Sequence, residues 1–401
     1  MSDVFILGAG FSKEIADLPL MEELSNKILD LLDESHVKEL RQQLPTFDRD
    51  NFETWLTYLS QSQPWLSEAQ NSRNQSLFLE ISERLSNVME GAQQRFDDKW
   101  PLPQVWKVVS ADNERKEREG VREQGSPGVY TERPIEEILG EHKEVLGLLK
   151  ETDQKRAMLL DIVQYFSQHK VDVITLNYDT LVERCWATIF YLTHRDPWGR
   201  TYFEYPASFA QPGFPGSPFA LGGRLGAPLW KATFPLYKLH GSLNWFYSGS
   251  RSFYGETIFC VRASAEESGH RPELLRDKVP LVIPPVMEKI PHFQHETIRG
   301  LWLQAGQALR KASNVYSVGY SLPGTDLTMQ FFLKVNAPKG KIPLYIVSRN
   351  AGGLALKRYR ELLGDTYDVR DDFTGSNAVQ LLVGGLTGSK SLEKDGKNKQ
   401  A

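Results

Sequence analysis

The chain has 401 residues, of which 40% are hydrophobic and 24% charged, a balance typical of a protein with a substantial core. The 47 basic and 51 acidic side chains give a formal net charge of −4, which does not indicate nucleic-acid binding or attachment to a membrane surface. The two cysteines, Cys185 and Cys260, are too few for a disulfide framework or a four-thiolate zinc site.

The apolar segments of the chain are all short. The run from Val4 to Gly10 has no basic flank, and no stretch approaches the roughly 20 apolar residues of a membrane span. We therefore expect a cytoplasmic protein that does not cross a membrane. Residues 389–401 are mostly Lys, Asp, Asn, Ser and Gly, a composition that predicts a disordered tail.

Short apolar, β-branched runs bounded by turn residues predict the strands of a sheet. Such continuous runs are typical of parallel strands that are covered on both faces, and several of them precede helical patterns. We therefore predict an α/β fold with a Rossmann-like parallel sheet. The expected strands are Val4–Leu7, Val171–Leu176, Leu236–Leu239, Val279–Ile283, Val315–Val318 and Leu344–Val347.

About 160 residues separate the first two expected strands, far more than an ordinary crossover connection contains. Apolar residues recur at helical spacing through most of this interval. We predict one domain, residues 1–388, in which a helical insertion at 21–164 interrupts a core formed by 1–20 and 165–388.

The first expected strand runs into a glycine-rich turn, Gly8-Ala9-Gly10-x-Ser12. Glycine lets the backbone approach a phosphate, and the N–H groups at a helix N-terminus favour an anion. The full dinucleotide-binding fingerprint is not met, because its third glycine would fall at Lys13. Taken alone, the motif is equally consistent with a nucleotide site and with a plain tight turn between strand and helix.

Polar residues follow the second expected strand, at Thr175, Asn177 and Asp179. Ligands of open α/β sheets bind beyond the carboxyl ends of the strands, so these side chains are placed where a site would lie. The alternative is an Asn turn followed by an Asp helix cap, an arrangement that is common in proteins.

The third expected strand ends at His240 and Gly241, with Trp245 placed to form a pocket wall nearby. A histidine at a strand end suits a general base near neutral pH, although a lone histidine is more often structural. A second histidine-containing segment, around His292 and His295, lacks metalloprotease spacing and a third ligand, so we predict no metal site.

The fifth expected strand is followed by Gly319 and Ser321. Pro323 breaks the Gly-x-Ser-x-Gly pattern of a serine nucleophile, so a turn that lines a ribose or phosphate fits better. The sixth is followed by Ser348, Arg349 and Asn350, whose side chains are placed to reach a ribose or an adenine.

In combination these motifs occur in the order found in the sirtuin superfamily, which the chain resembles over its sheet core, about half of its length. The matched positions are the phosphate loop (Gly8, Ala9, Gly10, Ser12), the Thr-Gln-Asn-x-Asp element (Thr175, Asn177, Asp179), the catalytic His-Gly (His240, Gly241) and the Gly-Thr-Ser turn (Gly319, Ser321), where Tyr320 replaces the threonine.

The chain also departs from the sirtuin deacetylases, which carry a four-cysteine zinc module after the His-Gly element. Here that interval contains Cys260 alone, so the resemblance implies a zinc-free branch and argues against peptide deacetylation. The long helical insertion and the phrase Leu-His-Gly-Ser-Leu-Asn-Trp resemble bacterial sirtuin-like proteins of anti-phage defence. In those proteins the domain hydrolyses NAD+ to ADP-ribose and nicotinamide, and the infected cell is starved of NAD+ in an abortive infection.

The resemblance implies a role for each matched residue. Asn177 would orient the nicotinamide ribose and the attacking water, Asp179 would contact the nicotinamide carboxamide, and His240 would act as a general base. The remaining matched residues, together with Asn350, would hold the pyrophosphate and the adenosine half of NAD+. These residues are Gly8, Ala9, Gly10, Ser12, Thr175, Gly319, Ser321 and Asn350.

The same resemblance implies partners and leaves alternatives. It implies a homo-oligomer assembled through the helical insertion and a separate HerA-type ATPase, since the chain has no P-loop of its own. Two other functions remain open: a non-catalytic sensor that binds NAD or ADP-ribose, and a protein deacylase or ADP-ribosyltransferase.

Overall fold

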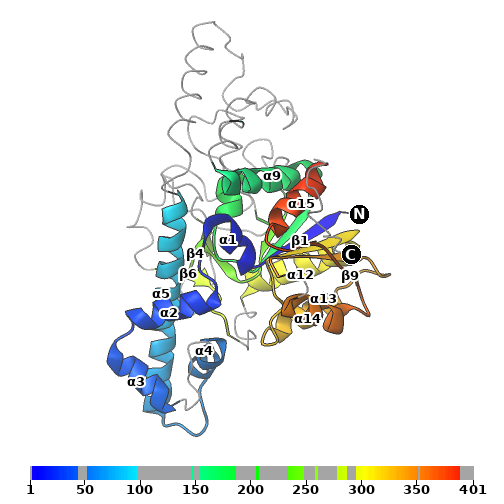
Figure 1. Ribbon diagram of the computed structural model, residues 1–401. Helices are drawn as coiled ribbons and strands as arrows, with labels where there is room; N and C mark the ends of the chain where they lie inside the picture. Colours follow the sequence, from blue (N-terminus) through cyan, green and yellow to red (C-terminus); the bar gives the residue numbers. More distant parts are fainter. Residues whose placement is uncertain are drawn as a thin grey trace, which may run out of the picture.

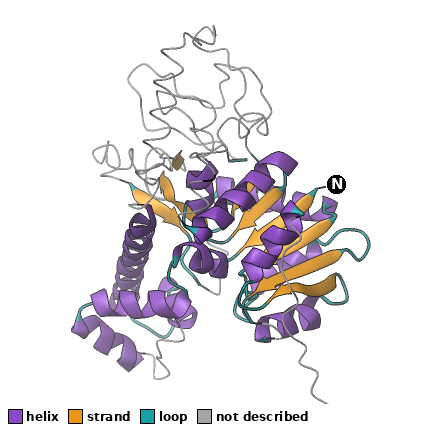
Figure 2. Cartoon of the chain, turned by 45° about the horizontal axis from the view of Figure 1, so that its top comes forward, coloured by secondary structure: helices purple, strands orange, loops and turns teal. Residues whose placement is uncertain are grey.

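The computed structural model has an α/β architecture built on two sheets (Figure 1, Figure 2). It describes residues 2–43, 52–97, 147, 153–186, 205–206, 234–247, 258–260, 278–286, 295–350 and 353–388. Within these residues, a six-stranded parallel sheet has the order β3-β2-β1-β7-β8-β9 and a three-stranded antiparallel sheet has the order β5-β4-β6. The predicted α/β fold with a Rossmann-like parallel sheet is therefore confirmed. The expected tail at 389–401 lies outside the described residues.

The central strand of the parallel sheet is β1, and helices cover it on both faces. Residues 4–6 have no exposed surface, as the continuous apolar run predicts. β1 pairs with β2 on one side and with β7 on the other, which places Leu7 level with Thr175 and Val318. The strands of this sheet are β1 (Asp3–Leu7), β2 (Asp172–Thr175), β3 (Leu236–Lys238), β7 (Asn314–Val318), β8 (Pro343–Ser348) and β9 (Asp368–Thr374).

The strand order creates a switch point beside β1. After β1 the chain adds β2 and β3 on one side, and it later adds β7, β8 and β9 on the other side. The loops that leave β1 and β7 therefore belong to the two diverging halves of the sheet. The crevice at the carboxyl ends of such neighbouring strands is where open α/β sheets bind ligands.

Two helical layers sandwich the parallel sheet. On one face α9 packs against α1 and α15, and on the other α12 contacts β2, β3 and α13 (Figure 1). Asp153 starts α9, because its carboxylate accepts hydrogen bonds from the backbone N–H groups of Lys155 and Arg156 at 3.0 and 3.2 Å. The helices are α1 (Ala9–Ala16), α9 (Gln154–His169), α12 (Glu296–Lys311), α13 (Leu327–Val335), α14 (Leu354–Leu363) and α15 (Ala378–Thr387).

A helical unit follows α1 and extends away from the parallel sheet (Figure 1). α2 and α4 pack against the long helix α5, which also contacts β4 and β6 of the small sheet. The unit consists of α2 (Met21–Leu31), α3 (Glu34–Gln43), α4 (Phe52–Ser60) and α5 (Glu68–Asp97). The boundary expected between residues 164 and 165 falls inside α9, and α9 packs with the helices of the core.

One strand prediction was wrong in its placement. The run at Val279–Ile283 was expected in the parallel sheet, but it forms β6 (Val279–Val282), which pairs antiparallel with β4 (Gly241–Tyr247). An apolar run shows that a strand is covered, but it does not identify the strand's neighbour. The close approach of the two strands depends on Gly241, where a Cβ would lie 2.0 Å from the carbonyl oxygen of Leu281.

Three strands were not predicted: β4, β5 (Ile258–Cys260) and β9. β9 is one of the two edge strands of the described parallel sheet, and its middle residues, Arg370 to Asp372, are charged and exposed. Charged side chains protect a sheet edge from further pairing, and they also remove the apolar pattern of a strand. No helix in the described part of the chain is long and apolar enough to cross a membrane.

Candidate functional site

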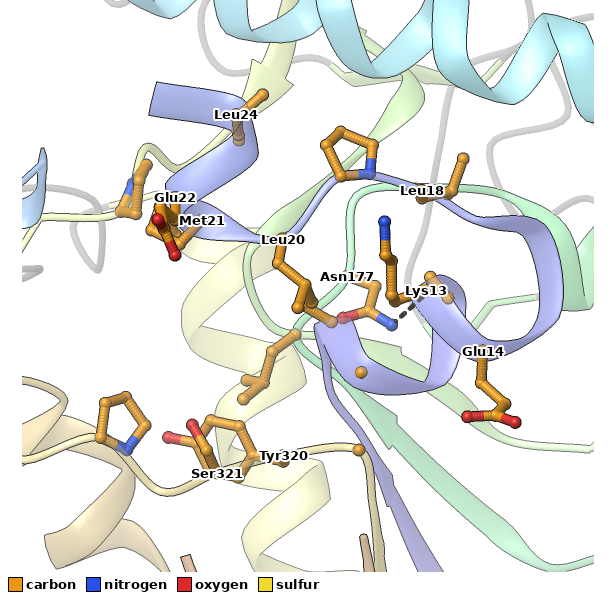
Figure 3. Close-up of a pocket in the computed structure, with 18 of the residues that line it drawn as sticks. Lys13, Glu14, Leu18, Leu20, Met21, Glu22, Leu24, Asn177, Tyr320 and Ser321 are labelled. Atoms are coloured by element: carbon orange, nitrogen blue, oxygen red, sulfur yellow. Dashed lines mark hydrogen bonds between the residues drawn. The ribbon is translucent and has the colours of Figure 1, made fainter. Parts of the chain in front are cut away.

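A cavity of about 770 Å³ opens at the carboxyl edge of the parallel sheet, at the switch point between β1 and β7. This volume lies within the ~300–1,000 Å³ of small-molecule and cofactor sites. The loops after β1, β2, β7 and β8 form its floor, and the helical unit supplies a further wall through α2, α4 and α5. Figure 3 shows Leu18 to Leu24 on one side of Asn177, and Tyr320 and Ser321 across from them.

The structure brings the predicted site residues together. Two of them lie directly behind the cavity wall: the Gly8 carbonyl accepts a hydrogen bond from Asn177 Nδ2, and Thr175 Oγ1 accepts one from the backbone N–H of Asn177. The others line the cavity itself: Ala9, Gly10, Ser12, Asn177, Asp179, His240, Gly319, Ser321 and Asn350.

Asn177 is held in one orientation at the end of β2. Its Nδ2 donates to Gly8 O at 2.9 Å and to Ser12 Oγ at 2.8 Å, and its side chain is 9% exposed. A backbone carbonyl can only accept, so the amino group must face Gly8 and the amide cannot flip. Figure 3 shows Asn177 Oδ1 on the opposite side, toward Leu20. Asn177 therefore presents a fixed hydrogen-bond acceptor to the cavity.

Ser12 links Asn177 to Asp179. Its hydroxyl accepts from Asn177 and donates to Asp179 Oδ2 at 2.6 Å, so one proton arrangement satisfies both contacts. The second carboxylate oxygen of Asp179 accepts from the N–H of Leu181 at 3.2 Å. Ser12, predicted as a phosphate contact, therefore uses its side chain to position the two polar residues that follow β2.

Asp179 is buried, and its environment acts on its pKa in opposing directions. Burial raises the pKa above the ordinary aspartate value, while the positive charge of Lys238 and the hydrogen bond from Ser12 lower it. The carboxylate thus stands in a low-dielectric site where its charge acts strongly on a neighbouring group.

His240 follows β3 and is 8% exposed. Its backbone carbonyl accepts from the N–H of Ile283 at 2.9 Å, and its ring lies near those of Tyr178 and Trp302, with centroids 6.5 and 6.4 Å away. The predicted neighbour Trp245 does not line the cavity. It is fully buried in β4, and the aromatic side chains found in the cavity lining among the described residues are those of Tyr178 and Tyr320.

Glycines let the loops after β1 and β7 touch. A Cβ on Gly8 would lie 2.6 Å from Tyr320 Cα, and one on Gly10 would lie 2.7 Å from Gly319 O. Gly319 has a φ of +66°, and a Cβ there would lie 2.1 Å from the backbone nitrogen of Phe11. The tight-turn interpretation of Gly-Ala-Gly therefore has a direct physical basis in loop packing.

We expect Gly319→Ala to destabilise the fold strongly. The left-handed φ costs a residue with a Cβ about 1–2 kcal/mol, and overpacking against the α1 backbone adds about 1–3 kcal/mol. Gly324→Ala, in the same loop, is the matched control, because a Cβ there would meet no atom within 4 Å. Denaturant unfolding of both variants measures the difference, and equal stabilities would refute this view of the loop contact.

The N-terminus of α1 is directed at the cavity through Ala9 and Gly10. Its first turn contains no acidic residue, so the positive end of the helix dipole favours an anion. Gly10 N–H already donates to Gly319 O at 2.8 Å, and Phe11 N–H donates to Gly8 O at 2.9 Å. These two N–H groups are already used, so the binding of an anion here would depend mainly on the helix dipole and on the remaining groups of this turn.

Among the described residues, two lysine or arginine side chains line the cavity, Lys13 and Arg349. Lys13 forms salt bridges of 2.8 Å with Asp17 and Glu23, and hydrogen bonds to these two carboxylates raise its pKa, so it is cationic. Arg349, in the loop after β8, pairs with Glu14 of α1. Both cations are therefore held in place at the cavity wall.

Sequence reasoning missed a buried ionic cluster behind the site. Lys238 Nζ lies 2.9 Å from Glu183 Oε1, and it also donates to the backbone carbonyl of Asp179. Tyr205 OH donates to the same Glu183 oxygen at 2.9 Å. The available signal was a lysine between apolar residues in an expected strand, since lysine is almost never fully buried unless it is paired.

No group of three or more His, Cys, Asp or Glu side chains in the described residues is arranged to hold a metal ion, and His292 lies outside those residues. No protein-family model matches this sequence, and no curated protein matches it with significant similarity.

Proposed function

We propose that the protein is an NAD+ hydrolase, which cleaves the nicotinamide–ribose bond to give ADP-ribose and nicotinamide. The observation that carries the proposal is the convergence of Asn177, Asp179 and His240 on one cavity at the sheet switch point. The order of these motifs along the chain, which resembles that of zinc-free sirtuin-like NADases, supports the same proposal.

The chemistry of this cleavage suits these three groups. Nicotinamide leaves as a neutral molecule, and the ribose gains positive charge as the bond breaks. In our proposal the buried carboxylate of Asp179 stabilises that charge and accepts from the nicotinamide carboxamide. Asn177 Oδ1 orients the ribose and the attacking water, and His240 accepts a proton from that water or from a ribose hydroxyl.

The rest of the cavity suits the remaining parts of NAD+. The N-terminus of α1 and Lys13 favour the pyrophosphate. The loops after β7 and β8 offer Ser321 and Asn350 to the adenosine half. Apolar side chains of the helical unit, including Leu24 and Met89, help exclude bulk water from the reacting bond.

We further propose, from the same resemblance, that the protein acts in the cytoplasm in anti-phage defence. It would work as a homo-oligomer beside a separate HerA-type ATPase and deplete NAD+ in the infected cell.

Induced expression in bacteria tests this function. We expect cellular NAD+ to fall about tenfold or more, because the proposed hydrolysis consumes NAD+ without regenerating it. We expect Asn177→Ala to abolish this fall. Quantifying NAD+ and ADP-ribose in extracts, with and without phage infection, provides the measurement. An unchanged NAD+ level in infected, expressing cells would contradict the proposal.

A further inference from the structure

The ion pair between Lys238 and Glu183 is an unusual feature of the site. Each side chain is 1% exposed, so both charges have been taken out of water. This desolvation is costly, and apolar residues of similar volume often replace a buried ion pair without loss of stability. Fold stability alone is therefore a weak reason for this pair to stand directly behind the cavity.

The pair connects the segments that carry the proposed reacting groups. Lys238 belongs to β3, two residues before His240, and its Nζ donates to the backbone carbonyl of Asp179. Glu183 lies four residues beyond Asp179, in the helical segment 181–186. One ammonium group thus ties the end of β3 to the loop that follows β2.

Further hydrogen bonds fix Glu183 itself. Tyr205 OH donates to Glu183 Oε1, and Tyr205 accepts from Asn244 Nδ2 at 3.2 Å. Asn244 Oδ1 in turn accepts from Ser242 Oγ at 2.6 Å, both residues being in β4. The carboxylate is therefore held by groups from outside the parallel sheet, and it holds Lys238 in turn.

We propose that Lys238, held by Glu183, is a positioning residue that fixes the Asp179 loop relative to His240. This inference rests on the proposed NAD+ hydrolysis, since it concerns the geometry of that site. Without the ammonium group, the backbone carbonyl of Asp179 loses its hydrogen-bond donor from β3. The distance between the Asp179 carboxylate and the His240 imidazole is then no longer fixed. A misplacement of about 1 Å at such a site costs about a hundredfold in rate.

The same pair acts on the Asp179 carboxylate, which provides a readout that a purely structural role would not move. The charge of Lys238 lowers the pKa of Asp179 and that of Glu183 raises it, with Lys238 having the larger effect. Removing the pair therefore raises the pKa of Asp179, so its carboxyl titrates at higher pH. The readout is this titration and not the pH profile of activity, because protonation of His240, the proposed general base, also stops the reaction at low pH. The other ionisable groups that line the cavity are Lys13, Glu14, Glu22, Glu53, Tyr178, His240, Tyr320, Asp326 and Arg349.

The test is the double variant Lys238→Met/Glu183→Gln, which replaces the ion pair by a neutral pair. We expect it to fold with near-native thermal stability, with kcat for NAD+ about a hundredfold lower, little change in KM and an Asp179 carboxyl that titrates at higher pH. The matched control is Lys334→Met/Asp365→Asn, which removes an exposed ion pair between α13 and the turn after α14 and should leave all of these unchanged. A folded double variant with wild-type kcat and a wild-type Asp179 titration would overturn the proposal.

A second variant covers failure of the first to fold. Glu183→Gln alone keeps an acceptor for Lys238 and Tyr205, and it removes only the charge that raises the Asp179 pKa. Its Asp179 carboxyl should therefore titrate at lower pH, opposite to that of the double variant. An unmoved titration, or one that moves to higher pH, would also overturn the proposal.

A measurement without substrate separates this inference from the proposed function. The ¹³C signal of the Asp179 carboxyl, identified by its loss in Asp179→Asn, should titrate at higher pH in the double variant than in wild type. Absence of NAD+ turnover in the wild type would reject the function and leave this titration as the test of the pair. Normal wild-type turnover with an unmoved titration would reject the pair's role and leave the function standing.

Discussion

Replacing Asn177 with alanine is expected to lower kcat for NAD+ hydrolysis by about 10²–10³-fold, the loss typical of removing one preorganised polar group from a reacting site. The variant loses the acceptor that Asn177 presents to the cavity, and it removes the hydrogen bonds to Gly8 O and Ser12 Oγ. Single-turnover measurements with saturating NAD+ give this effect on the chemical step directly.

The isosteric variant Asn177→Asp separates shape from hydrogen bonding. Its carboxylate would face the Gly8 carbonyl oxygen, and it would share the Ser12 hydroxyl with the carboxylate of Asp179. Both neighbours would repel the new negative charge, so activity should stay as low as in the alanine variant. Asn314→Ala is the matched control, because Asn314 Nδ2 also donates to another side chain, the carboxylate of Asp3, but at the opposite edge of the sheet. Wild-type kcat in Asn177→Ala would remove this residue from the mechanism.

Replacing His240 with alanine is expected to lower kcat by about 10²–10⁴-fold, the usual contribution of a general base. Its ring is buried at the end of β3, where Tyr178 and Trp302 limit its movement. We expect ADP-ribose to bind to His240→Ala with near-native affinity, because a general base acts mainly in the transition state and one hydrogen bond to a ribose hydroxyl contributes little to binding. Calorimetric titration and steady-state kinetics together separate the two effects.

His36→Ala provides the control for the loss of an imidazole. His36 lies on α3 in the helical unit and pairs with Glu80, away from the cavity. Its substitution should leave kcat unchanged. A kcat loss confined to His240→Ala together with unchanged ADP-ribose binding supports the general-base role, whereas an equal loss of binding would assign the ring to substrate contact.

Much of the sheet could be predicted from the sequence because its central strands are buried on both faces. Continuous apolar runs marked β1, β2, β3, β7 and β8. The same reasoning failed at β9, which is an exposed edge strand, and at β6, which pairs in the small antiparallel sheet. Strand pairing is a long-range property, and local patterns give no information about it.

The site was predictable to the extent that parallel strands share one carboxyl edge. Residues that follow different strands, such as Asn177 and His240, converge because the sheet brings those ends together. The contacts between them were not predictable, since the Ser12 bridge and the Lys238–Glu183 pair join residues 167 and 55 positions apart. Each of these residues had an ordinary local explanation, as a helix residue, a strand residue or a surface charge.

The central claim is that this cavity cleaves NAD+ without a second substrate. The most direct measurement incubates the purified full chain with NAD+, without any acyl-lysine peptide and with or without extract of phage-infected cells, and quantifies the products by chromatography. We predict equal amounts of nicotinamide and ADP-ribose, formed by wild type and not by Asn177→Ala. Intact NAD+ in the presence of tight ADP-ribose binding would contradict the claim and identify a sensor, and turnover only with an acyl-lysine peptide would contradict it in favour of a deacylase.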